Sequence, residues 1–352
     1  TPIDFLRRAL AVHPDREAVV HGDLRFTYAD FAGRCRRLAS ALRARGIGRG
    51  DTVAIMAPNI PAMLEAHYGV PMTGAALNSI NIRLDADAVA FILDHGEAKI
   101  FIADRAFHAV AVAAVAKLDR PIPMICIDDA PRAAGEALGP RFGACDYEAL
   151  LEEGDPEAEW GGPADEWDAI GLNYTSGTTG DPKGVVVHHR GAYLNAMADI
   201  LAYDVRPHTR YLWTQPMFHC NGWCFTWAIT AVGGTHVCLR RVDPALIFEL
   251  VAEERVDLLC GAPIVLTMLI HAEEAVKRRP EHSATMVTGG AAPPSAVIAA
   301  MKELGFEVVH AYGMTEIYGP AATCFPQEDW GDLDLDALAT RMARQGERNV
   351  GV

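Results

Sequence analysis

Short apolar segments of strand length alternate with helical segments along almost the whole chain, and this alternation limits the possible folds more than any other feature. In the first half, residues 51–59 (DTVAIMAPN), 98–104 (AKIFIAD) and 123–128 (PMICID) indicate buried strands, and residues 106–118 indicate a helix between two of them. Strands that alternate with helices in this way form a mostly parallel sheet covered by helices. Ligands are then expected at the carboxyl ends of the strands.

The second half repeats this layout. Five further segments indicate strands: 211–216, 235–240, 256–263, 285–290 and 307–313. Five segments indicate helices: 190–203, 222–232 (GWCFTWAITAV), a helix opened by Asp243-Pro244, 265–278 (VLTMLIHAEEAVKR) and 294–304. The predicted fold class is therefore α/β, with two doubly wound, mostly parallel sheets and flanking helices. A polar stretch from Glu152 to Asp165 indicates a linker, so we predict a first α/β subdomain over residues 1–165 and a second over 166–352.

The first elements carry local signals of their own. Residues 18–28 predict a hairpin that turns at Gly22 and Asp23. Thr27, with Asp30 three residues later, predicts a capping box at the start of a helix. Four apolar residues at helical spacing predict the buried face of this helix: Phe31, Cys35, Leu38 and Leu42.

Composition excludes several classes of protein. Half of the residues are hydrophobic and 22% are charged, which is typical of a folded globular protein. The net charge of -15 argues against a nucleic-acid partner, because phosphate backbones are bound by a surplus of Lys and Arg. No apolar run reaches the roughly 18–20 residues of a membrane span. Eight cysteines without paired CxxC motifs predict reduced thiols and a cytoplasmic location.

The segment TSGTTGDPKG, from Thr175 to Gly184, has no large apolar side chain to pack. Glycines and small hydroxyl residues let several backbone N–H groups turn toward one point, where they bind an anion. Lys183 adds a positive charge suited to phosphate oxygens. The segment lacks the GxxxxGK[ST] pattern, since Gly184 follows the lysine. By composition alone, such a segment is more often a flexible connector.

In its order of residues this segment resembles the phosphate-binding signature of the adenylate-forming, AMP-binding enzymes, which include acyl-CoA synthetases. Companion motifs follow in the family's order. PMFHCNGW (Pro216–Trp223) resembles the segment beside the acyl pocket, TGGAAPPS (Thr288–Ser295) the adenine-binding turn, and AYGMTE (Ala311–Glu316) the Y-G-x-T-E signature. The resemblance covers essentially the whole chain and implies the family's large N-terminal domain.

The resemblance implies roles for individual residues in binding ATP. The ATP phosphates would be held by Thr175, Ser176, Gly177, Thr178, Thr179, Gly180 and Lys183. Tyr312 would stack on the adenine, and the base would be lined by Gly290, Ala291, Ala292 and Gly313. Thr315 would hold the α-phosphate and Glu316 would bind Mg²⁺. The plainer alternatives are that Tyr312 belongs to the core and that Glu316 is a carboxylate at a helix start.

The acid would bind next to the nucleotide. His219, together with Trp223, Gly290 and Gly313, would line its site, and Lys183, Thr315, Glu316 and His219 would be the catalytic set. Amino-acid-activating members carry an aspartate shortly after the position of His219, and HCNGWCFTW has no carboxylate. The plainer alternatives are that His219 is an interior histidine with its hydrogen bonds satisfied and that Trp223 only packs under the loop.

The implied reaction joins a carboxylic acid to coenzyme A in two steps. The carboxylate attacks the α-phosphorus of ATP, pyrophosphate leaves, and the thiol of coenzyme A then displaces AMP from the acyl-adenylate. We expect a short-, medium- or modified-chain fatty acid. Adenylation of an aryl or amino acid, and a non-catalytic nucleotide-binding fragment, remain the alternatives. A homodimer is common in the family, but no segment here indicates an interface.

The chain also departs from the family pattern. The family carries a second T-G-D signature for the ribose, an arginine hinge and a C-terminal lid domain with a catalytic lysine. The TGD of this sequence is Thr179-Gly180-Asp181, inside the phosphate segment itself. We therefore expect an N-terminal portion without the lid, weakly active or inactive by itself.

Overall fold

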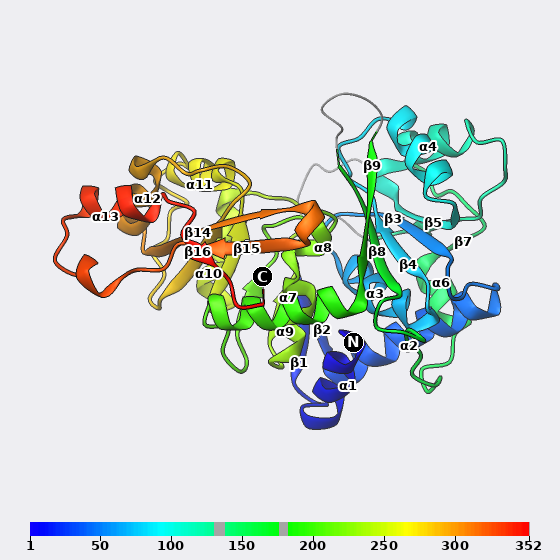
Figure 1. Ribbon diagram of the computed structural model, residues 1–352. Coiled ribbons are helices and arrows are strands. Elements are labelled where there is room, and N and C mark those ends of the chain that lie inside the picture. The colour runs from blue at the N-terminus through cyan, green and yellow to red at the C-terminus, as the bar shows by residue number, and fades with distance from the viewer. Residues whose placement is uncertain (130–137, 176–181, 352) are drawn as a thin grey trace.

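The structure is a computed structural model that describes residues 1–129, 138–175 and 182–351. Within these residues two mostly parallel β-sheets lie side by side, with helices packed around them (Figure 1). The predicted α/β fold class is confirmed.

The larger sheet takes most of its strands from the second half of the chain. In spatial order its strands are β16 (Glu347–Arg348), β15 (Gly319–Thr323), β14 (Phe306–Met314), β13 (Ala284–Thr288), β12 (Leu258–Gly261), β10 (Arg210–Leu212), β11 (Thr235–Val237), β1 (Glu17–His21) and β2 (Leu24–Thr27). The β1–β2 hairpin and the β14–β15–β16 edge are antiparallel, and the other neighbours are parallel.

The smaller sheet comes mainly from the first half. In spatial order its strands are β7 (Cys145–Asp146), β6 (Met124–Ile127), β5 (Ala98–Asp104), β3 (Thr52–Met56), β4 (Ala76–Ser79), β8 (Ala169–Thr175) and β9 (Lys183–His188). All neighbours are parallel except β8 and β9, which form the long upright pair in Figure 1.

Each sheet contains strands from both sides of residue 165, the boundary between subdomains that the sequence predicts. The first hairpin joins the larger sheet, since Val19 of β1 pairs with His236 of β11. The β8–β9 pair joins the smaller sheet, since Gly171 of β8 pairs with Leu77 of β4. The two halves of the chain are therefore interlocked.

Most helices begin at local signals in the sequence. The right-handed α-helices are α1 (Ile3–Val12), α2 (Tyr28–Ala44), α3 (Pro61–Gly69), α4 (Ala86–His95), α5 (His108–Val115), α6 (Tyr147–Glu152), α7 (His189–Ala202), α9 (Phe225–Ala231), α10 (Pro244–Glu253), α11 (Pro263–Ile270), α12 (Ser295–Glu303) and α13 (Leu335–Met342). The short element α8 (Cys220–Trp223) is a left-handed turn. Short 3-10 turns are η1 (Pro71–Thr73), η2 (Arg105–Phe107), η3 (Thr315–Ile317) and η4 (Glu328–Trp330). The predicted capping box of Thr27 and Asp30 is present at α2. None of the described helices is both long and apolar enough to cross a membrane.

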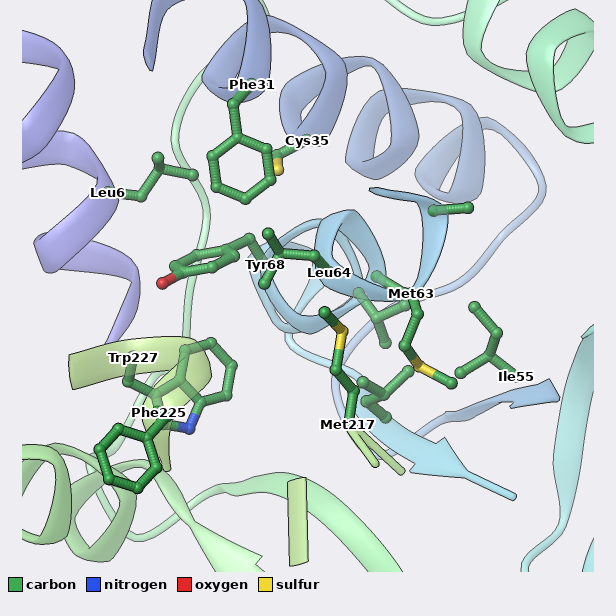
Figure 2. Packing of buried hydrophobic residues seen from close by; sticks show 14 of the residues in the cluster. Leu6, Phe31, Cys35, Ile55, Met63, Leu64, Tyr68, Met217, Phe225 and Trp227 are labelled. Atoms are coloured by element: carbon green, nitrogen blue, oxygen red, sulfur yellow. The ribbon is translucent and has the colours of Figure 1, made fainter. Parts of the chain in front are cut away.

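The main core lies where α1, α2, α3 and α9 meet, and it joins the two sheets (Figure 2). Tyr68 stands at its centre, with its ring centroid 5.5 Å from that of Phe31 and 5.0 Å from that of Trp227. Its hydroxyl donates to the backbone oxygen of Thr226 at 2.8 Å, which satisfies a buried polar group. The predicted face of α2, which includes Phe31 and Cys35, is fully buried here.

One predicted helix is wrong at its start. Residues 222–232 were expected to be helical throughout, but α9 begins only at Phe225. The preceding residues, Cys220–Cys224, have left-handed backbone angles that cannot continue a right-handed helix.

Candidate active site

Five consecutive residues, Cys220 to Cys224, form a left-handed turn between the two sheets. Their φ angles are 42°, 43°, 65°, 54° and 64°. This conformation costs an L-residue about 1–2 kcal/mol, and besides glycine only Asn and Asp adopt it readily. Asn221 and Gly222 therefore suit the middle of the turn, whereas Cys220, Trp223 and Cys224 are held there by their surroundings.

The turn is held by bonds from both sides, because α8 contacts β8 and β15 (Figure 1). On the β8 side, Asn173 Nδ2 donates to Asn221 Oδ1 at 2.6 Å. On the β15 side, Cys224 Sγ donates to the backbone oxygen of Tyr318 at 3.3 Å. Within the turn, Thr226 Oγ1 donates to the backbone oxygen of Asn221 at 3.2 Å.

A small cavity of about 40 Å³ lies against this turn. It is lined by His219, Cys220, Trp223, Gly289, Gly290, Ala311, Gly313, Met314, Gly319 and Pro320. The structure thus brings together the four residues predicted for the acid site: His219, Trp223, Gly290 and Gly313.

Glycines keep the walls of this cavity in place. A Cβ atom at Gly289 would lie 2.7 Å from the backbone oxygen of Ala311 and 3.1 Å from Cη2 of Trp223. A Cβ atom at Gly313 would lie 2.0 Å from the backbone oxygen of Gly319. Larger residues at these positions would displace the indole or the strand pair β14–β15.

A second cavity of about 40 Å³ lies on the other side of His219 and Cys220. It is lined by Asn78, Ser79, Ile80, Asn81, Leu84, Ile92, Asn173, Tyr174, Phe218, His219, Cys220 and Thr315. Cys220, which lines both cavities, donates through Sγ to Thr315 Oγ1 at 3.2 Å. Within the described residues, the side-chain amide of Asn78 and Oδ1 of Asn173 have no hydrogen-bond partner, which makes this cavity suited to a polar group.

Lys183 lies at the open end of the β8–β9 pair, opposite Thr175. The lysine is exposed and makes no ion pair within the described part of the chain, so its ammonium can bind an anion. The remaining residues of the predicted phosphate segment lie outside the described residues: Ser176, Gly177, Thr178, Thr179 and Gly180.

The predicted nucleotide residues follow the carboxyl ends of two neighbouring parallel strands, β13 and β14. Gly290, Ala291 and Ala292 come directly after β13, and all three are exposed. Tyr312, near the end of β14, is 42% exposed, so it is not a core residue. This position agrees with the rule that ligands bind at the carboxyl ends of parallel strands.

Thr315 and Glu316 lie in η3, directly after β14. Thr315 is buried at the second cavity. Glu316 is exposed and has no ion pair within the described residues, so its carboxylate is available to a cation. The described residues contain no group of three or more His, Cys, Asp or Glu that could hold a metal. A single carboxylate fits Mg²⁺, which proteins commonly bind through one or two carboxylates together with substrate phosphates.

The protein shifts the titration of two groups at the cavity. Desolvation by the surrounding protein lowers the pKa of His219 below its usual range, so its ring is neutral at pH 7. Burial raises the pKa of the Cys220 thiol, so this cysteine stays protonated and can donate to Thr315. A neutral imidazole can donate or accept a hydrogen bond with a carboxylic acid.

Several residues of the site were missed from the sequence. Gly319 and Pro320 line the first cavity, and the bond between Asn173 and Asn221 holds the turn. The dipeptide Asn221-Gly222 was an available signal, because Asn-Gly marks turns with positive φ. Asn173 carried no such signal, since it stands inside an ordinary strand pattern.

Comparisons with known proteins identify similar sequences and structures. The sequence model of the family described as "AMP-binding enzyme" matches residues 6–342. The chain is 45% identical to the peroxisomal acetate/butyrate–CoA ligase AAE7 of Arabidopsis thaliana, and it is covered completely by that match. It is 41% identical, again over its whole length, to the peroxisomal benzoate–CoA ligase of the same plant.

Among solved structures, the chain is similar to the N-terminal domain of FACL13 from Mycobacterium tuberculosis. The TM-score is 0.81 at 28% sequence identity, and the match covers 99% of this chain and 82% of that one. The chain spans 63% of the length of the acetate/butyrate relative and 62% of the benzoate relative.

Proposed function

Since the chain belongs to the AMP-binding enzyme family, we propose that it forms the acid- and nucleotide-binding part of an AMP-forming acid–CoA ligase. The observation that carries the proposal is the first cavity. Four residues from three separate segments, His219, Trp223, Gly290 and Gly313, line one small space, and Cys220 links its wall to Thr315.

The nucleotide would lie across the carboxyl ends of β13 and β14. Tyr312 would stack on the adenine, and Gly290 with the two alanines after it would follow the edge of the base. Lys183 would bind the phosphates that leave as pyrophosphate, because its ammonium is exposed and unpaired within the described residues. Thr315 would donate to the α-phosphate from the position where it now accepts from Cys220.

Glu316 would hold Mg²⁺ together with phosphate oxygens, and the ion would neutralise part of the charge that develops on the phosphates. The protein's own contribution is positioning: one oxygen of the acid must meet the α-phosphorus while pyrophosphate leaves on the opposite side. His219, neutral at pH 7, would orient the carboxylate by a hydrogen bond without removing a proton. The thiol of coenzyme A would then displace AMP.

The wall of the first cavity favours a short-chain acid. The bulky indole of Trp223 forms part of this wall and limits the room for an acyl chain. This favours acids such as acetate or butyrate over an aromatic acid. The benzoate relative keeps an aryl acid as the second candidate, and a binding protein without catalysis is the third.

Carboxylate-dependent exchange between ATP and pyrophosphate tests the proposal. The complete gene product would be assayed with acetate, butyrate, octanoate and benzoate, and with no acid. We expect exchange with the two short acids only. Lys183→Ala should lower the exchange rate about tenfold or more, because a charge-assisted hydrogen bond is lost. Lys99→Ala, which removes an exposed lysine on β5, is the matched control and should change nothing.

Two results would contradict the proposal. Tight ATP binding without exchange for any acid would indicate a nucleotide-binding protein. Exchange with benzoate but not with acetate or butyrate would indicate an aryl-acid ligase.

For the cellular location we propose the cytoplasm, because all eight cysteines are free. The peroxisomal matrix is the alternative, since both plant relatives named above are peroxisomal. Cell fractionation of the tagged gene product distinguishes the two. A homodimer is also proposed, and light scattering of the purified protein tests it.

A further inference from the structure

Asn173 and Asn221 connect the two sides of the site. The side-chain amide of Asn173 donates to Oδ1 of Asn221 at 2.6 Å, and both side chains are buried. We propose that these two asparagines form a positioning pair that holds the acid cavity in place relative to the bound nucleotide. This inference rests on the proposed function and adds two residues to it.

Asn221 is suited to this role by its backbone as well as its side chain. Its φ and ψ angles of 43° and 50° are left-handed, a conformation that Asn adopts more readily than most residues. Its side chain packs closely against β8, because a Cβ atom at Gly171 would lie only 3.1 Å from Asn221 Oδ1. The side chain of Asn221 is thus in direct contact with the strand.

On the strand side, the pair is close to the residues that would bind phosphate. Asn173 stands two residues before Thr175 in β8 and pairs with Val185 of β9, two residues after Lys183. A strand pair is rigid over such a distance. The bond that holds Asn173 therefore also fixes the base of the strand pair that carries Lys183.

On the turn side, the pair is close to the acid cavity. Asn221 lies between Cys220, which contacts Thr315, and Trp223, which lines the cavity. A left-handed turn is strained, so it depends on such bonds to keep its geometry. If the bond from Asn173 is lost, we expect the turn to relax and to move the cavity wall.

A shift of this kind matters because reacting atoms must be held about 3–3.5 Å apart, and a displacement of about 1 Å can cost roughly 100-fold in rate. The pair does not touch the reacting atoms and acts through the turn. Its loss should therefore affect ligands that span both sides of the site much more than ligands that occupy one side.

The experiment compares three ligands by isothermal titration calorimetry on the 352-residue chain. AMP occupies the nucleotide side, butyrate the acid side, and 5′-O-(N-butanoylsulfamoyl)adenosine, a stable mimic of butyryl-AMP, occupies both. The variants are Asn221→Gly, which keeps a residue that tolerates positive φ, and Asn173→Ala, which removes the same bond from the strand. The double variant completes a mutant cycle.

Asn349→Ala is the matched control. Asn349 is also buried, and its Oδ1 also accepts a side-chain hydrogen bond, from Thr323 at 2.8 Å. It lines neither cavity of the site. Thermal unfolding of each variant records its stability separately from ligand binding.

We expect each single variant to bind AMP like the unaltered chain and to bind the spanning mimic at least about fivefold more weakly, the lower end for one buried hydrogen bond. The double variant should lose no more than either single variant, because both remove one interaction. An equal loss for AMP and the mimic, no loss at all, or additive losses would each overturn the inference. If Asn221→Gly does not fold, Asn173→Ala alone decides. If the unaltered chain binds neither AMP nor the mimic, the proposed function itself is refuted, and the inference with it.

Discussion

The replacement Trp223→Gly tests whether Trp223 would limit the length of the proposed acid substrate. Trp223 is 8% exposed and forms one wall of a cavity of about 40 Å³. Its φ of 54° is left-handed, so glycine relieves about 1–2 kcal/mol of backbone strain at this position. This relief offsets part of the roughly 3–5 kcal/mol that removing a buried tryptophan costs in stability.

The magnitude follows from the apolar surface that a longer acid would bury. Each buried methylene contributes about 0.8 kcal/mol. The four further carbon atoms of octanoate relative to butyrate would therefore contribute about 3 kcal/mol when fully buried, or roughly 200-fold in kcat/KM. If the indole excludes these atoms in the unaltered protein, as we propose, kcat/KM should fall steeply from butyrate to octanoate.

The assay measures kcat/KM for pyrophosphate exchange with acids of two, four, eight and twelve carbon atoms. Trp227→Phe is the matched control, because Trp227 is a buried tryptophan of α9 that packs against Tyr68 and does not line the cavity. The control should lower stability and leave the order of preference unchanged.

An unchanged preference in Trp223→Gly would refute the reasoning. The indole would then only pack beneath the turn, and chain length would be set by other residues. A loss of activity with every acid, at normal AMP affinity, would also contradict it, because the change should enlarge the cavity and keep the nucleotide side intact.

Three further replacements test the packing of the chain through urea unfolding. The Asp199 carboxyl is buried without a partner in the described residues, and burial raises its pKa. The unfolded chain therefore releases a proton that the folded chain keeps, so the free energy of unfolding falls as pH rises above about 4, by up to about 1.4 kcal/mol per pH unit. Asp199→Asn should remove this fall. If the free energy of unfolding changes equally in the variant and the unaltered chain between pH 5, 6 and 7, the prediction is wrong. Arg34→Met should cost about 3–5 kcal/mol, because Glu65, fully buried 2.6 Å from Arg34 Nε, loses its counter-charge; an unchanged midpoint would disprove this. Tyr68→Phe should cost about 1 kcal/mol, since the hydrogen bond from Tyr68 to the backbone oxygen of Thr226 is lost while Thr230 Oγ1 still donates to that oxygen at 3.2 Å; a cost near zero would mean that the bond from Thr230 is sufficient.

Features with local causes could be predicted from the sequence. The α2 helix is the clearest example: Thr27 caps it, Asp30 completes the capping box, and its predicted apolar face is buried. Two sheets were likewise expected from the alternation of elements. These signals depend on residues close to one another in the chain.

Features with distant causes could not be predicted. The pattern of residues 222–232 is helical, yet the start of this segment follows a left-handed turn that is bonded to β8 and β15. Asn173 and Asn221 are 48 residues apart, and only the fold brings them together. The predicted helix over 265–278 ends at Ile270, because half of its later residues are charged and these residues form no continuous apolar face.

The residues of the candidate site also divide into those with a local signal in the sequence and those without one. His219, Trp223, Gly290 and Gly313 could be predicted because each belongs to a motif, and the structure places them around one cavity. Gly319 belongs to no motif and reaches this cavity only because β15 folds back along β14.

The early hairpin has a consequence for how the protein is made in the cell. Val19 can pair with His236, its neighbour in the finished sheet, only after His236 has left the ribosome. At the usual synthesis speed of about 5–20 residues per second this takes roughly 10–40 s, during which one edge of β1 stays open. A nascent chain in that condition is a natural client for chaperones that shield unpaired strands, and slower translation would lengthen its exposure to aggregation.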